Sequence, residues 1–271
     1  MKKAFLFLVP IAVIFFSCDK KEIMERNFKE QEVKLSTHSL MTYKAMTDKS
    51  TVVVFETGLG DEASVWVENK VIPEVSKFAD IVVYDRAGYG KSSKGPAPRD
   101  INKLSSDLEA VIKEIPADKK IILVGHSLGG MIIRDYAIKN PQRVKSLLFI
   151  DPAHEDYNNP SQSEEDMIYN LMKSLKSQSP GAAMEARELI EDAAYLRTLP
   201  SLPNIPVIVL TSMKTTAQSD AADRQKAYNA HETLKAGVSD FTHKQTAEAG
   251  HYIQREDPSL VIESIRTLSN K

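Results

Sequence analysis

Short apolar runs alternate with longer amphipathic stretches along most of this sequence. The runs at residues 51–55, 81–84, 121–124, 144–150 and 206–210 are rich in Val, Ile and Leu and contain few polar positions. Runs of this length and composition are typical of strands that are buried on both faces of a sheet. Because the runs alternate with helical patterns, the sequence predicts an α/β fold with a mostly parallel, doubly wound sheet.

The stretches between these runs show the helical period. At residues 101–115 the apolar positions share one face of a helix, and Asp100 precedes them as an N-cap. Other helices are expected over 63–72, from 128 to about 141, over 224–236 and over 258–268. Further strands are expected as two short segments within 32–49 and one segment over 241–246.

Residues 155–202 interrupt the alternation of strands and helices. Apolar positions within 168–175 and 183–196 fall at helical spacing, so we expect a helical insertion here. A surface excursion is one interpretation, and a cap over an active site is the other. The predicted domains are therefore a core of residues 31–154 and 203–271, and a helical cap of residues 155–202.

The N-terminus has the pattern of an export signal. Lys2 and Lys3 make the start of the chain basic, and they precede an apolar run of about 13 residues, 4–16, which is short for a membrane-spanning helix. The following Ser17-Cys18 pair resembles the end of a bacterial lipoprotein signal, although the phenylalanines at 15–16 depart from the usual pattern.

Cys18 is the only cysteine in the chain, so no internal disulfide can form and lipidation is the preferred interpretation. We expect a signal peptide over 1–17, a charged tether over 18–30 and a membrane anchor at Cys18. The protein would then be an exported lipoprotein of the cell envelope, facing the periplasm or the surface. The alternatives are a plain secretory signal, or an anchor, with an incidental cysteine.

Composition narrows the functional classes. The 271 residues are 42% hydrophobic and 27% charged, with a formal net charge of −2, which suits one large globular domain. This balance gives no electrostatic footprint for nucleic acid. The spacing of His, Cys and carboxylate residues indicates no metal cluster, so we expect neither a metal nor an organic cofactor.

The stretch at residues 125–129, G-H-S-L-G, has the spacing of a nucleophile elbow. A buried strand leads into it and a helical pattern leads out, so Ser127 lies at a sharp turn, where we expect a positive φ. Gly125 and Gly129 stand where side chains would collide. The N–H of Leu128 lies at a helix N-terminus, where partial positive charge favours an oxyanion. The alternative is a glycine-rich turn that contains serine by chance.

Four segments in this order resemble the α/β-hydrolase family of serine hydrolases, which includes esterases and lipases. They are residues 56–60 (ETGLG), 85–92 (DRAGYGKS), 125–130 (GHSLGG) and 250–251 (GH). The resemblance extends over about residues 31–271, with the cap region least similar. It implies the α/β-hydrolase fold, in which the functional loops follow the strands.

The resemblance also implies roles for particular residues. Ser127 would be the nucleophile and His251 the general base, with the backbone N–H groups of Leu59 and Leu128 as the oxyanion hole. The family often has His-Gly in the oxyanion loop, and this chain has Thr57-Gly58 instead. A backbone donor at Leu59 survives that change.

The acid that orients His251 has several candidates. In this family it usually follows the strand that is here residues 206–210, but the next carboxylates along the chain are Asp220 and Asp223. A second known placement is one strand earlier, where Asp151 stands, with Asp156 nearby. We favour Asp151, because Pro152 would stiffen its loop and the order Ser, Asp, His is retained.

The function implied by these residues is cleavage of a carboxylic ester, or of a thioester, lactone or amide, through an acyl-enzyme on Ser127. The substrate would be a small acyl compound. A serine at the elbow disfavours epoxide hydrolase and haloalkane dehalogenase chemistry, which uses aspartate there. Two alternatives stay open: a carbon–carbon bond hydrolase with the same triad, and a non-enzymatic, lipid-anchored protein that binds ligands in the cap cleft.

Overall fold

The computed structural model describes residues 28–67, 70–175, 180–217 and 219–271. The expected signal peptide, Cys18 and most of the expected tether lie outside these residues. The core begins slightly earlier than expected, because Phe28 is already buried and the first strand starts at Lys29, before the predicted boundary at residue 31. The strands are β1 (Lys29–Lys34), β2 (Ser39–Ala45), β3 (Thr51–Glu56), β4 (Asp80–Tyr84), β5 (Lys120–His126), β6 (Val144–Ile150), β7 (Val207–Ser212) and β8 (Phe241–Thr246).

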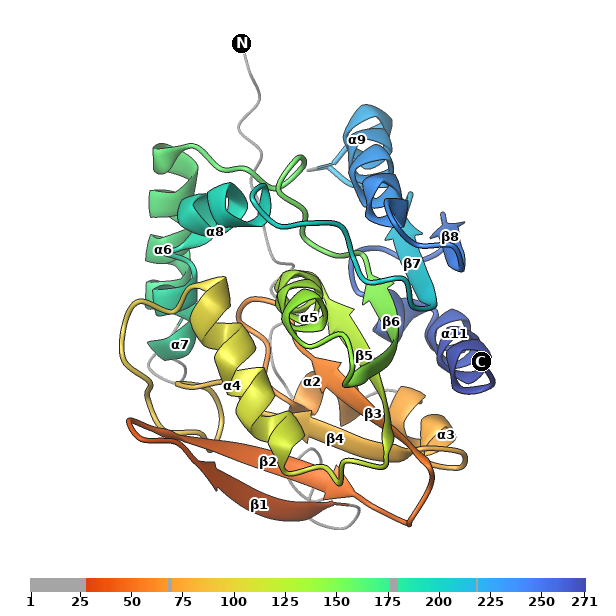
Figure 1. The fold of residues 1–271 in the computed structure, drawn as a ribbon. Helices are drawn as coiled ribbons and strands as arrows, with labels where there is room; N and C mark the ends of the chain where they lie inside the picture. Colours follow the sequence, from red (N-terminus) through yellow and green to blue (C-terminus); the bar gives the residue numbers. More distant parts are fainter. Residues whose placement is uncertain (1–27, 68–69, 176–179, 218) are drawn as a thin grey trace.

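These strands form one eight-stranded sheet in the order β1-β2-β4-β3-β5-β6-β7-β8. Strands β1 and β2 run antiparallel, β2 pairs antiparallel with β4, and all the remaining pairs are parallel. Since parallel strands require crossover connections, helices lie on both faces of the sheet (Figure 1). The predicted doubly wound α/β architecture is confirmed.

The sheet separates two apolar cores, and strand β3 shows how. Val52 and Val54 belong to the core under helices α4 and α5, whereas Val53 and Phe55 belong to the core under α3 and α11. Successive side chains of a strand point to opposite faces, so an all-apolar strand fills both cores. The helices are α2 (Ser64–Val67), α3 (Val71–Val75), α4 (Ile101–Lys113), α5 (Leu128–Lys139), α6 (Gln162–Ser174), α7 (Pro180–Glu185), α8 (Leu189–Leu196), α9 (Ala221–Glu232), η1 (Thr233–Lys235), α10 (Ile253–Glu256) and α11 (Pro258–Ser269).

Three expected helices differ from those observed. The helix expected over 63–72 is two short helices, α2 and α3. The helix expected over 183–196 is also two, α7 and α8, and each holds a buried carboxyl group that contacts the core, Glu185 in α7 and Asp192 in α8. The helix expected from Arg224 begins three residues earlier, because Asp220 caps it.

The segment between β6 and β7 is helical, as expected, and consists of α6, α7 and α8. Ile168 and Met172 of α6, Ala182 of α7 and Ala186, which follows α7, form a small apolar core together with Tyr89, which follows β4. In Figure 1 the three helices lie together beyond α4 and α5, on the opposite side of the molecule from α9. The insertion therefore packs onto the core domain rather than extending away from it.

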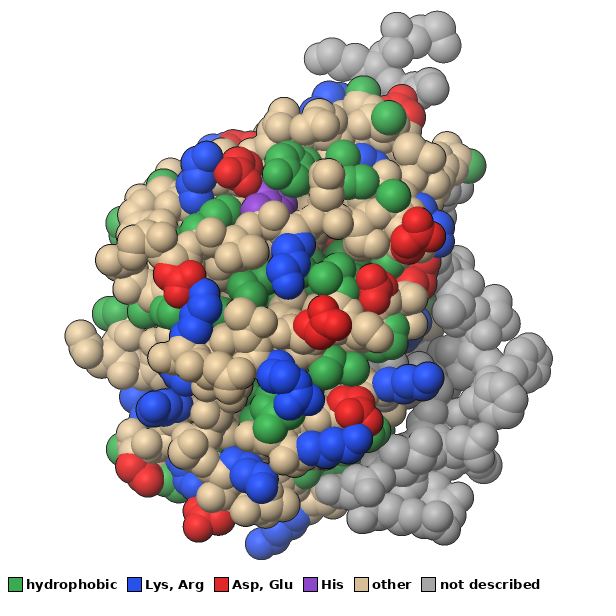
Figure 2. Space-filling view, turned by 90° about the vertical axis from the view of Figure 1, so that its right-hand side faces the viewer, with side chains coloured by type: hydrophobic (Ala, Val, Ile, Leu, Met, Phe, Trp, Pro, Cys, Tyr) green, Lys and Arg blue, Asp and Glu red, His purple; other side chains and the backbone are tan. Residues whose placement is uncertain are grey.

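The surface on the side of β8, α9 and α11 carries basic and acidic side chains interspersed with one another, as Figure 2 shows. This distribution agrees with the small net charge of the whole chain. Among the described residues, no helix combines the length and the apolar character needed to cross a bilayer.

Candidate active site

Ser127 lies at the turn between β5 and α5, with φ 53° and ψ −121°. This strained conformation is possible because two neighbouring positions lack side chains. A Cβ at Gly125 would lie 2.5 Å from the carbonyl oxygen of Gly129, and one at Gly129 would lie 2.7 Å from the carbonyl oxygen of Glu56. The predicted backbone conformation of the elbow is thus observed, and Ser127 lines a pocket.

Asp151 follows β6 and has φ 38°, in the left-handed region that aspartate tolerates better than most residues. Its Oδ2 lies 2.7 Å from Nδ1 of His251. Its Oδ1 accepts hydrogen bonds from the backbone N–H of Ser212, at 3.0 Å, and from Nη2 of Arg224, at 2.6 Å. The carboxylate is therefore fixed on both oxygens, by three elements that are distant in the sequence.

Burial of Asp151 acts to raise the pKa of its carboxyl group. The hydrogen bond from His251 and the positive charges of His251 and Arg224 outweigh burial and hold this pKa below its usual range. Asp151 is therefore an anion at neutral pH, although only 3% of the residue is exposed to solvent.

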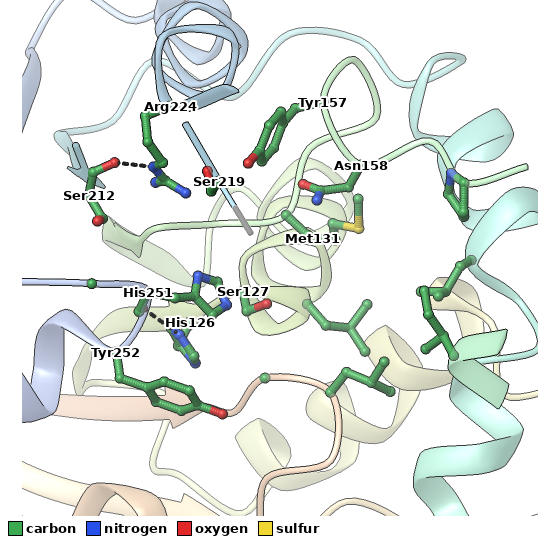
Figure 3. Close-up of a pocket in the computed structure, with 18 of the residues that line it drawn as sticks. His126, Ser127, Met131, Tyr157, Asn158, Ser212, Ser219, Arg224, His251 and Tyr252 are labelled. Carbon is green, nitrogen blue, oxygen red and sulfur yellow. Dashed lines mark hydrogen bonds between the residues drawn. The ribbon is translucent and has the colours of Figure 1, made fainter. Parts of the chain in front are cut away.

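His251 lies on the loop between β8 and α10, and its side chain is 26% exposed. Its backbone oxygen accepts a hydrogen bond of 3.0 Å from Nε2 of His126. With Nδ1 turned to Asp151, the rest of the imidazole faces the pocket beside Ser127, as Figure 3 shows. The structure thus brings Ser127, His251 and Asp151 to one place at the carboxyl edge of the sheet.

The other candidate acids have different contacts. Asp220 and Asp223 form a reciprocal capping box at the start of α9, in which each side chain accepts from the backbone N–H of the other. Asp156 is exposed, and its backbone N–H donates to His154. Of the four carboxylates considered from the sequence, Asp151 is the one in contact with His251.

The loop after β3 packs against the elbow. A Cβ at Gly58 would lie 3.2 Å from Cβ of Ser127, so this position admits only glycine without rearrangement. Leu59 follows in the same loop, and both Leu59 and Leu128 line the pocket with Ser127. Leu128 is the first residue of α5, where a backbone N–H has no intrahelical acceptor. The two expected oxyanion donors therefore flank the candidate nucleophile.

These residues open onto a cavity of about 590 Å³, within the range of small-molecule sites. Its polar lining includes Ser212, Ser219, Arg224 and Tyr157, which Figure 3 shows on the β7 and α9 side of Ser127. Its apolar lining comes from the oxyanion loop, from α5 and from the insertion, and consists mainly of Leu59, Leu128, Met131, Ile168 and Leu189. The cavity is amphipathic, and α6 and α8 close its apolar part.

Two features of the site have no clear signal in the sequence. Arg224 binds Asp151, but it lies in the first turn of α9, and nothing in its sequence neighbourhood distinguishes it from any other arginine in a helix. Arg86 lies in the segment resembling a family motif, but its partner Glu185 is one acid among several in the insertion. Among the described residues, no group of three or more His, Cys, Asp or Glu side chains is arranged to hold a metal ion.

Comparison with known proteins adds independent information. The sequence model of the alpha/beta hydrolase fold family matches residues 51–263. The chain is 25% identical to the uncharacterized protein YqjL of Bacillus subtilis (strain 168) over 209 residues, which cover 77% of this chain and 79% of that protein.

A shorter stretch of 105 residues is 34% identical to the (lyso)-N-acylphosphatidylethanolamine lipase of Mus musculus. It covers 38% of this chain and 30% of the lipase, so the similarity spans less than a third of that protein. Among solved structures, carboxylesterase CesB (YbfK) from Bacillus subtilis superposes with a TM-score of 0.66 at 16% identity, over 92% of this chain and 94% of that chain. Its likeness concerns the fold.

Proposed function

Because this chain belongs to the alpha/beta hydrolase fold family, we propose that it cleaves carboxylic esters through an acyl-enzyme on Ser127. One observation carries the proposal. The buried, ionised carboxylate of Asp151 lies 2.7 Å from Nδ1 of His251, and His251 lines the same cavity as Ser127, whose backbone is strained. A carboxylate that is hydrogen-bonded to Nδ1 of an imidazole fixes the tautomer of the ring and stabilises its protonated form. Both effects help the imidazole to act as a general base at Nε2.

The reaction begins when Ser127 Oγ attacks the carbonyl carbon of the ester and its proton passes to Nε2 of His251. The N–H groups of Leu59 and Leu128 stabilise the oxyanion, and each such donor contributes about 3 kcal/mol. Collapse of the tetrahedral intermediate breaks the C–O bond, and His251 returns the proton to the leaving alkoxide. Water, deprotonated by His251, then releases the acid and restores Ser127.

The cavity lining favours an amphipathic ester. We place the acyl chain toward Ile168 and Leu189, because burial of a methylene group there is favourable by about 0.8 kcal/mol. The alcohol group then faces Tyr157, Ser219 and Arg224, whose polar atoms can replace water. The insertion acts as a cap in this arrangement, because α6 and α8 supply the acyl side of the site.

Fluorophosphonate labelling and a series of nitrophenyl esters of rising acyl length test the proposal. The wild-type protein should label at Ser127 and hydrolyse the series with an optimum in chain length. Ser127→Ala should fold normally, label at no residue and lose several orders of magnitude in kcat, because the nucleophile is absent. An unlabelled, inactive wild-type protein, or a Ser127→Ala variant within tenfold of wild type, would contradict the assignment.

A further inference from the structure

A buried cluster under the oxyanion loop joins that loop to the insertion, and we call it the loop clamp: Arg86, Tyr89 and Glu185. Arg86 follows β4, and its side chain is 0% exposed. Its Nη1 donates to the carbonyl oxygen of Thr57 at 2.8 Å, and its Nη2 donates to the carbonyl oxygen of Gly58 at 2.9 Å. One rigid guanidinium thus holds two consecutive carbonyl groups of the loop.

The second of these contacts determines where an oxyanion donor points. The carbonyl of Gly58 and the N–H of Leu59 belong to the same peptide group, which is planar and trans, so they point in opposite directions. Among the described residues the only cis peptide bond is at Ala97–Pro98. When Arg86 holds the carbonyl of Gly58 from beneath the loop, the N–H of Leu59 is turned to the other side of the peptide.

The insertion holds Arg86 in place. Glu185 of α7 accepts from Nε of Arg86 at 2.7 Å and from Nη2 at 2.9 Å, a bidentate contact in which both side chains are at most 1% exposed. The same carboxylate accepts from the hydroxyl of Tyr89 at 2.6 Å. That hydroxyl accepts in turn from the N–H of Gly60, at 3.2 Å. Glu185 therefore anchors contacts on both sides of Leu59.

The electrostatics of the cluster keep Arg86 charged. Its burial acts to lower the pKa of the guanidinium, but the charges of Glu185 and Glu56 outweigh burial and raise this pKa well above its usual value. Glu56 also accepts from Nη1 of Arg86, at 2.9 Å. Removal of the Glu185 charge consequently loosens the orientation of Arg86 without leaving it as an unpaired buried cation.

We propose that Arg86, Tyr89 and Glu185 are positioning residues, through which docking of α7 sets the orientation of the Leu59 N–H in the oxyanion hole. The proposal rests on the esterase function above. None of the three lines the described cavity, so they act on the reaction through the loop and not through contact with substrate. The insertion then has a second role besides shaping the acyl side: it completes transition-state stabilisation.

The test compares Glu185→Gln with a matched control, Asp192→Asn. Both substitutions replace a buried carboxyl group of the insertion, one that contacts the core, with an amide of the same size. Asp192 accepts from the backbone N–H of Ile101, the first residue of α4, rather than from Arg86 or Tyr89, and does not line the cavity. Two ligands distinguish oxyanion stabilisation from ordinary binding in the cavity. Ser127 adds to the carbonyl carbon of a trifluoromethyl ketone, and the adduct carries an oxyanion. The matching trifluoromethyl alcohol fills the same space without an oxyanion.

For Glu185→Gln we expect kcat on a nitrophenyl ester to fall about 10- to 100-fold with KM within about threefold, because loss of a complete oxyanion donor costs about 10²- to 10³-fold. The inhibition constant of the ketone should rise by a similar factor, and that of the alcohol should stay constant. Asp192→Asn should match wild type in kcat, KM and both inhibition constants.

Three results would overturn the proposal: wild-type kinetics in Glu185→Gln, equal loss of affinity for ketone and alcohol, or the same losses in Asp192→Asn. If Glu185→Gln does not fold, Tyr89→Phe decides, because it keeps the ion pair and removes the acceptor for the Gly60 N–H. Wild-type kcat and ketone affinity in Tyr89→Phe would then refute the clamp. A wild-type protein without esterase activity would instead refute the proposed function.

Discussion

At the scale of single residues, the surroundings of Asp151 explain how the acid that we propose can follow β6. Strand β7, after which this family usually has its acid, ends at Ser212, whose N–H donates to Asp151 at 3.0 Å. Ser212 Oγ donates to the carbonyl oxygen of Ala249, close to His251 in the chain. The small serine therefore leaves room for a carboxylate from the neighbouring strand. Arg224 completes its coordination, since Nη2 donates to Oδ1 of Asp151.

This arrangement predicts the effect of Asp151→Asn. The variant should fold, because Asn still accepts from Ser212 and Arg224, but kcat should fall by about 10³- to 10⁴-fold, because the amide favours the wrong tautomer of His251. Steady-state hydrolysis of a nitrophenyl ester measures the loss.

Asp220→Asn is the matched control, since asparagine caps a helix about as well as aspartate and α9 should be unaffected. An inactive Asp220→Asn beside an active Asp151→Asn would move the acid to the segment after β7.

At the scale of elements, the helices of the insertion are joined to the core by buried carboxylates. In α8, Asp192 accepts a hydrogen bond of 2.8 Å from the N–H of Ile101, the first residue of α4. Burial raises the pKa of Asp192 to about 8, although the hydrogen bond from Ile101 opposes the shift. The α8–α4 contact is therefore made by a carboxyl group that is neutral at pH 6.

The raised pKa of Asp192 predicts a pH dependence of stability. Because the folded state binds this proton more tightly than the unfolded state, its stabilising contribution is complete below pH 4 and is lost as pH rises toward about 8. The slope of this loss is at most about 1.4 kcal/mol per pH unit.

Asp192→Asn should lack this component. The free energy of unfolding of the variant minus that of wild type, from urea titrations between pH 4 and 9, should rise with pH and level off above 8. A difference that is constant across this range would show that the carboxyl group of Asp192 titrates normally in the folded protein.

At the scale of the whole molecule, the parallel sheet collects the site from distant parts of the chain. Ser127 follows β5, Asp151 follows β6, and His251 follows β8, so all three residues lie at the carboxyl edge of the sheet. The insertion covers the apolar part of the same cavity through α6 and α8. The proposed reaction therefore takes place at this edge, whatever position the chain has in the cell.

For that position we propose lipidation of Cys18, on the sequence pattern alone. Acyl chains add about 0.8 kcal/mol of membrane affinity per buried methylene, so the mature protein should fractionate with membranes and start at Cys18. Cys18→Ser should be released or remain as an uncleaved precursor, whereas Ser17→Ala, which keeps a small residue before the cysteine, should behave as wild type. Mass spectrometry that finds an unmodified Cys18 in a membrane-bound mature protein would contradict this.

The sequence by itself determined the features that depend on near neighbours in the chain. Apolar periodicity predicted the strands and the layered sheet, since burial follows the local pattern of side chains. The elbow was equally predictable from its G-x-S-x-G spacing, and Gly125 relieves a collision within those five residues, with the carbonyl oxygen of Gly129. The capping of α9 by Asp220 is also local, although we expected that helix to begin later.

Contacts between residues far apart in the chain emerge only in the folded structure. Arg224 and Asp151 are 73 residues apart, and Arg86 and Glu185 are 99 apart. Periodicity over 183–196 likewise did not reveal the break between α7 and α8, whose carboxyl groups Glu185 and Asp192 have partners far away in the chain. A buried charge is stable only when an opposite charge lies close to it in the folded chain, because burial removes its hydration. The order of the strands determines which residues come close, and local sequence patterns do not specify that order.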